Sequence, residues 1–203
     1  DGGRTKRTDF RAVNSGWYSC FLPGTKVLMA DGSAKNIEAV KIGESVLSYD
    51  ETKMQNVVSK VTSAMREEAS EYLVINIEAG EAGRNPAGSH AGTQIKVTAE
   101  HPFYSEGKWI EAGKLTAGNK LLTNDGKEAE VKTIEKVSLE KPIAVYNLEV
   151  SSAEYQSGDR HPAGQDLSHN YYVGSQGHKV TGSNETASEP LTFDLSTFDF
   201  VLA

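Results

Sequence analysis

The chain of 203 residues has a single cysteine, at position 20, and contains no long apolar run. One cysteine cannot form an intramolecular disulfide, so the fold must be stable without one. No run approaches the roughly 18 apolar residues of a membrane-spanning helix, so we expect no transmembrane segment. Basic residues are outnumbered as well, because 21 lysines and arginines face 28 acidic residues and give a net charge of −7. This balance argues against nucleic acid or an anionic membrane as the main partner.

Turn-forming residues, in contrast, are abundant. The chain carries 19 glycines and many Asn, Asp and Ser clusters, which separate short runs rich in strand-forming residues. This pattern is typical of many short strands joined by turns. The expected strands are 26–29, 46–49, 56–65, 72–77, 95–97, 108–110, 129–137 and 144–150. We therefore predict an all-β fold.

Two stretches of the chain resemble one another. IEAVKIGESVL at 37–47 aligns with IEAGKLTAGNKLL at 110–122 if a gap of two residues is allowed. The alignment pairs Ile37 with Ile110, Lys41 with Lys114, Gly43 with Gly118 and Leu47 with Leu122. Two copies are too few for a solenoid. They indicate a domain of two similar β subunits related by a pseudo-two-fold axis.

Two segments without hydrophobic periodicity interrupt the strands, and we predict loop excursions at 79–93 and 151–168. The first contains the tetrapeptide NPAG and the second contains HPAG. His90 and His161 lie in these segments. Two histidines without further spaced ligands are weak support for zinc, so we expect no metal site and no other cofactor.

Cys20 stands directly ahead of a strand–turn–strand unit whose turn is Asp31-Gly32. A lone cysteine is most often a buried small hydrophobe, but a cysteine in this place can be exposed and rigidly held, as a nucleophile must be. Its surroundings resemble the start of a Hint domain, the autoprocessing module shared by inteins, bacterial intein-like domains and hedgehog C-terminal domains. The residues that carry the resemblance are Cys20-Phe21, Gly24-Thr25, Val27, Asp31-Gly32, Ile37-Glu38, Gly43 and Val46.

Two later motifs extend the resemblance. VTAEHPF places Thr98 and His101 in a TxxH arrangement, and HNYYVG supplies His169, as in two further blocks of Hint domains. TxxH alone often arises by chance, but all three pieces in this order are specific. The resemblance covers 20–182 and implies a Hint-fold horseshoe of two pseudo-two-fold related β subunits. Residues 1–19 would then be an upstream host flank, and 183–203 a downstream flank that ends in a strand-like run able to pair with a sheet.

The resemblance implies a reaction at the Ser19–Cys20 peptide bond. The Cys20 sulfur would attack the carbonyl carbon of Ser19 in an N–S acyl shift and form a thioester. A thiol with a pKa of about 8.5 is a few per cent thiolate near neutrality, which is enough for attack. His101 would protonate the departing nitrogen, and the Thr98 hydroxyl would hold the scissile amide and stabilise the oxyanion. His169 would polarise the thioester or hold the local fold.

Full protein splicing is not expected. A splicing intein ends in His-Asn followed by Cys, Ser or Thr, and the late histidine motif places this C-terminal junction at Thr181, Gly182 and Ser183. The His-Asn pair is absent there, and we interpret Asn170 as structural. The chain therefore resembles intein-like domains that cleave at their N-terminal side. Water, or an amine or thiol from another chain, would accept the acyl group.

Two other functions stay open at this stage. One is an inactive Hint-fold insert in a larger surface or phage-tail-type protein. The other is a thiol-dependent hydrolase acting on separate substrates, although the surroundings of Cys20 do not resemble those in papain-like enzymes. We expect a monomer whose partners are its own flanking segments, in a host that is secreted, on the cell surface or part of a phage.

Overall fold

The computed structural model describes residues 19–79, 92–152, 170–174 and 200–203, and nearly all its regular structure is antiparallel strand. The strands are β1 (Lys26–Leu28), β2 (Ala34–Asn36), β3 (Ser45–Asp50), β4 (Gln55–Ala79), β5 (Gly92–Val97), β6 (Pro102–Ser105), β7 (Lys108–Glu111), β8 (Lys120–Leu122), β9 (Glu128–Ser152), β10 (Tyr172–Gly174) and β11 (Phe200–Leu202). Two short 3₁₀ turns are η1 (Ile37–Ala39) and η3 (Ala112–Lys114). The predicted all-β class is confirmed. Within the described ranges, no helix is long and apolar enough to cross a membrane.

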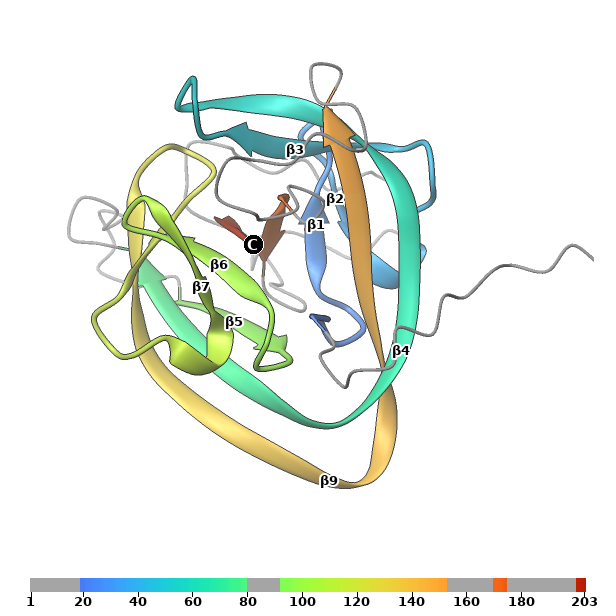
Figure 1. Cartoon of the computed structure of the whole chain (residues 1–203), viewed down its shortest axis with the longest axis vertical. Helices are drawn as coiled ribbons and strands as arrows, with labels where there is room; N and C mark the ends of the chain where they lie inside the picture. Colours follow the sequence, from blue (N-terminus) through green and yellow to red (C-terminus); the bar gives the residue numbers. More distant parts are fainter. Residues whose placement is uncertain (1–18, 80–91, 153–169, 175–199) are drawn as a thin grey trace, which may run out of the picture.

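The strands form two sheets. The smaller sheet has the order β11-β10-β1-β2, and the larger has the order β3-β4-β9-β8-β6-β7, with β5 also paired to β4. The 25-residue strands β4 and β9 pair with each other along most of their length, with three register shifts. Such irregularities bend a strand pair. Figure 1 shows β4 and β9 curving around the molecule as a horseshoe, with the shorter strands and the chain end at residue 203 inside the curve.

The two long strands continue through polar stretches where sequence analysis had placed breaks. Residues 66–71 and 138–143 carry exposed and half-buried side chains, so hydrophobic alternation is weak there. Residues 66–69 nevertheless pair with 143–146, and Glu71 pairs with Ser138, while 139–142 form a bulge between these two pairings. Lys136 and Glu71 also form an ion pair across the strands at 2.9 Å. The prediction of four separate strands was wrong, because backbone pairing sustains a strand without an apolar face.

The predicted duplication is confirmed, but its alignment needs correction. The Val40 N–H donates to the Ile37 carbonyl at 3.2 Å, and the Leu115 N–H donates to the Ala112 carbonyl at 3.2 Å. Ile37 therefore corresponds to Ala112, and the same spacing relates Gly43 to Gly118. Both Ile37 and Ala112 are buried, whereas Ile110 is only partly buried. The two-residue gap disappears once the buried start of each 3₁₀ turn sets the alignment.

Gly43 and Gly118 provide a test of this symmetry. Their φ angles are 92° and 94°, and their N–H groups donate at 2.8 Å to Val61 and Val131. A Cβ added at either glycine would meet no atom within 4 Å. An alanine there would therefore reduce stability only through the strain of its positive φ. We expect Gly43→Ala and Gly118→Ala each to lower the free energy of unfolding by about 1–2 kcal/mol, measured by urea unfolding.

The matched control is Gly92→Ala. Gly92 has no positive φ, and its added Cβ would lie 3.7 Å from the nearest carbonyl oxygen. We expect a change within about 0.5 kcal/mol. A large loss for only one of Gly43 and Gly118 would contradict an equivalent role in the two subunits.

The last four residues of the chain lie inside the core. Residues Phe200, Val201, Leu202 and Ala203 are all at most 2% exposed. β11 pairs with β10, as the strand-like character of this run had suggested. On its other side, the Asn124 N–H donates to the Phe200 carbonyl at 3.1 Å, and the Phe200 N–H donates to Asn124 Oδ1 at 3.2 Å. Residues that sequence analysis assigned to the downstream flank thus complete the smaller sheet.

Candidate active site

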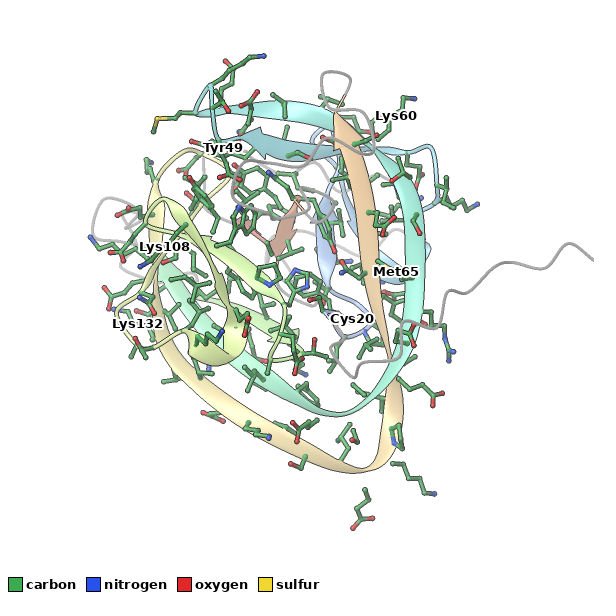
Figure 2. The ribbon with its side chains drawn as sticks, viewed as in Figure 1. Cys20, Tyr49, Lys60, Met65, Lys108 and Lys132 are labelled. Atoms are coloured by element: carbon green, nitrogen blue, oxygen red, sulfur yellow. The ribbon has the colours of Figure 1, made fainter. Side chains whose placement is uncertain are left out.

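The segment that carries Cys20 runs between β5 and β9. Phe21 exchanges two backbone hydrogen bonds with Tyr146, at 2.7 and 2.8 Å, and the Leu22 N–H donates to the Lys96 carbonyl at 3.1 Å. Cys20 is only 3% exposed. Figure 2 shows it on the inner side of the curve made by β4 and β9. Of the two alternatives, the exposed thiol is wrong, because the side chain packs in a buried cluster with Leu22 and Val145.

Both polar groups of the Ser19–Cys20 peptide bond have a side-chain partner. The Cys20 N–H donates to Thr98 Oγ1 at 2.9 Å. On the other side, Asn147 Nδ2 donates to the Ser19 carbonyl oxygen at 2.5 Å. A donor on this oxygen polarises the carbonyl and stabilises the negative charge that develops when a nucleophile adds. The Ser19 hydroxyl also donates to the Glu100 carbonyl at 3.2 Å, which fixes the residue on the acyl side.

Asn147 was missed by sequence analysis, although it is 2% exposed and its side chain donates to the Ser19 carbonyl oxygen. Its Oδ1 accepts from the Leu148 N–H at 2.8 Å and from the Tyr171 hydroxyl at 2.5 Å. A backbone N–H can only donate and a carbonyl can only accept, so these partners fix which end of the amide faces Ser19. The available signal was an asparagine within YNLEV, since asparagine is uncommon in strands.

The TxxH motif lies next to this peptide bond. The His101 N–H donates to the Thr98 carbonyl at 3.3 Å, which closes the turn between the two residues. The His101 side chain is fully buried, with its ring centroid 4.2 Å from that of Phe21. The structure therefore brings Cys20, Thr98 and His101 together, as their order in the sequence suggested.

The remaining predicted residues cannot be located in the described structure. His169, the junction residues Thr181, Gly182 and Ser183, and the loop histidines His90 and His161 lie outside the described residues. Within the described ranges, no group of three or more His, Cys, Asp or Glu side chains is arranged to hold a metal ion.

The electrostatic surroundings of Cys20 hold its thiol in the neutral form. Burial raises the pKa of Cys20 from its ordinary value of 9.0 to about 12, and the nearby carboxylates of Glu67 and Glu100 add to this effect. A thiolate in this place would be poorly solvated and would face negative charge. The thiol is therefore protonated at neutral pH, and the expected few per cent of thiolate is wrong for the folded chain.

This shift predicts a pH dependence of stability. The unfolded chain loses the Cys20 proton above pH 9, whereas the folded chain keeps it to about pH 12. Stability contributed by the neutral thiol is complete below pH 9 and falls as the pH rises, because the folded pKa is the higher one. Relative to Cys20→Ala, the parent should lose about 1.4 kcal/mol between pH 8 and pH 10, measured by urea unfolding. A pH-independent difference between the two proteins would contradict the raised pKa.

A cleft of about 300 Å³ opens beside Thr98. It is lined by residues 68–73 of β4, the turn at 98–100 and Lys136 of β9. Thr98 belongs both to this lining and to the hydrogen bond with the Cys20 nitrogen. The cleft thus reaches a residue that is hydrogen-bonded to the Ser19–Cys20 peptide group.

Comparison with known proteins places this arrangement in a family. A family model described as the pretoxin HINT domain matches residues 26–179. The chain belongs to the pretoxin HINT family. This Hint domain is also similar in structure to the bacterial intein-like domain from Clostridium thermocellum, with a TM-score of 0.60 and 29% identity over 78% of this chain and 95% of that one. Members of the Hint superfamily are generally self-processing.

Two further comparisons agree with the fold. The TvoVMA intein has a TM-score of 0.53 and 18% identity, over 80% of this chain and 96% of the intein, which shows the fold alone. Among curated proteins, Protein RecA of Mycolicibacterium fallax is 31% identical over 109 residues, 52% of this chain and 24% of that protein. Protein RecA of Mycobacterium leprae is also 31% identical over 109 residues, 52% of this chain and 14% of that protein. The Hint domain thus spans about a quarter or less of the length of these relatives.

Proposed function

We propose that this Hint domain cleaves its own chain at the Ser19–Cys20 bond through an N–S acyl shift. The observation that carries the proposal is the pair of hydrogen bonds on that peptide group, from Asn147 Nδ2 to the carbonyl oxygen and from the Cys20 N–H to Thr98. One bond is placed where negative charge develops, and the other fixes the leaving nitrogen. Such preorganised contacts supply much of the stabilisation of an acyl-transfer transition state.

In the first step, the Cys20 thiol loses its proton to a base from solvent, and the sulfur bonds to the Ser19 carbonyl carbon. The carbonyl oxygen becomes an oxyanion held by Asn147. The C–N bond then breaks, and His101 delivers a proton to the departing nitrogen of Cys20. The product is a thioester between Ser19 and the Cys20 sulfur, with a free amine on Cys20.

The second step transfers the acyl group to an acceptor. We propose water, or an amine or thiol from another chain, since the cleft beside Thr98 offers an incoming nucleophile room. Hydrolysis would release the upstream segment 1–19, and an amine acceptor would ligate it to another molecule. Without a His-Asn pair at Thr181-Gly182, full splicing is not part of the proposal.

Intact mass spectrometry of the freshly made chain tests this function. The parent and Cys20→Ala are each incubated with and without dithiothreitol or hydroxylamine. We expect the parent to lose residues 1–19, faster with added nucleophile, and the variant to keep its full mass. An unchanged mass in every sample would overturn the proposal and would favour an inactive Hint-fold insert in a larger surface or phage-tail-type protein.

A further inference from the structure

A second residue acts on the scissile carbonyl through Asn147. We propose that Tyr171 is a positioning residue that orients and polarises the Asn147 carboxamide toward the Ser19 carbonyl oxygen. Its hydroxyl donates to Asn147 Oδ1 at 2.5 Å, and Asn147 Nδ2 donates to Ser19 at 2.5 Å. The inference rests on the proposed function, because it assigns a role within the same reaction.

The position of the Tyr171 hydroxyl is fixed from several sides. Its backbone exchanges two hydrogen bonds of 3.0 Å with Ala203. Its ring packs edge-on against Phe21, with centroids 6.3 Å apart, and the whole residue is fully buried. Phe21 directly follows the nucleophile, so one packed unit holds both Cys20 and the tyrosine. The hydroxyl therefore needs no rearrangement when the reaction begins.

The hydroxyl serves as a donor throughout the reaction. Burial raises the pKa of Tyr171 far above its ordinary value, so the group stays neutral. Two hydrogen bonds run in the same direction, from the Tyr171 hydroxyl to Asn147 and from Asn147 to the Ser19 carbonyl oxygen. Consecutive hydrogen bonds of this kind strengthen one another. Negative charge on the Ser19 oxygen strengthens the hydrogen bond from the Asn147 N–H. This polarises the Asn147 carboxamide and strengthens the hydrogen bond that its Oδ1 accepts from the tyrosine hydroxyl. Tyr171→Phe removes this donor from Oδ1 and leaves the bond from the Leu148 N–H in place.

Tyr171→Phe tests this role, and the neighbouring residue offers a matched control. Tyr172 is also fully buried, but its hydroxyl donates to Asn56 Oδ1 at 2.7 Å, in a different cluster. We expect Tyr171→Phe to slow thioester formation roughly tenfold, the effect of one lost buried hydrogen bond. Tyr172→Phe should leave the rate within twofold of the parent. Equal rates for the parent and Tyr171→Phe would overturn the inference.

A double-mutant cycle separates positioning from a general loss of structure. On an Asn147→Ala background, the tyrosine hydroxyl has no carboxamide to act on. Tyr171→Phe should then change the rate by less than twofold. The same tenfold slowing on both backgrounds would show that Tyr171 acts independently of Asn147, and would overturn the inference.

A measurement that needs no cleavage distinguishes this inference from the proposed function. In Cys20→Ala protein, NMR follows the ¹³C shift of the Ser19 carbonyl and the side-chain amide signals of Asn147. Adding Tyr171→Phe should move both sets of signals, whereas adding Tyr172→Phe should move neither. Unmoved signals would overturn the positioning role even if the parent cleaves. Shifted signals in a domain that never cleaves would refute the proposed function alone.

Discussion

Replacing Asn147 with alanine is expected to slow cleavage at the Ser19–Cys20 bond by about 100- to 1000-fold. The Asn147 amide is the side-chain donor on the scissile carbonyl oxygen, at 2.5 Å, and it is almost fully buried. Water cannot readily take its place in so enclosed a site, so the developing oxyanion would lose its partner. The measurement is the single-turnover rate of hydroxylamine-induced release of residues 1–19, followed by intact mass.

Asn170→Ala is the matched control. Asn170 is likewise buried, and its side chain forms two hydrogen bonds to the backbone of Tyr49, at 2.9 and 2.7 Å. Its loss should lower stability about as much as the loss of Asn147 but leave the cleavage rate within a few-fold of the parent. Comparable rates for Asn147→Ala and Asn170→Ala, at a temperature where both are folded, would refute the assignment of Asn147 as the oxyanion donor.

The candidate site shows which residues a sequence can reveal. Cys20, Thr98 and His101 could be predicted because a single cysteine and a TxxH motif are distinctive residue types in a recognisable order. Asn147 could not, because its role depends on a bond to Ser19 that only the folded chain creates. The burial of Cys20 was missed for the same reason, since pairing with both β5 and β9 is a long-range contact.

Some features of the fold could likewise be predicted from the sequence and others could not. The short strands and the duplication could be predicted from hydrophobic alternation and turn residues. The unbroken length of β4 and β9 could not, because their middle portions are polar and are stabilised by pairing with each other. The alignment of the two subunits also needed the structure, since Ala112 and Ile110 are both apolar and only the equivalent turns and their burial show that Ala112 corresponds to Ile37.

A chain ending at residue 199 is expected to lose most of its cooperative structure. The side chains of Phe200, Val201 and Leu202 are each at most 2% exposed. Full burial of such a side chain contributes about 1.5–3 kcal/mol, so the three together contribute roughly 5–9 kcal/mol. The whole stability of a domain is typically about 5–15 kcal/mol. Circular dichroism and urea unfolding should show a weak transition or none in the truncated chain.

Single substitutions test whether the burial of the β11 side chains causes this loss of stability. Phe200→Ala should cost about 3–5 kcal/mol, as for a buried aromatic side chain. Ile42→Ala, at a position 66% exposed, should change stability by less than about 0.5 kcal/mol. If the chain ending at 199 unfolded at the same urea concentration as the parent, β11 would be dispensable for the core. Because the backbone of Ala203 pairs with that of Tyr171, the truncation also removes one of the contacts that hold the tyrosine in place.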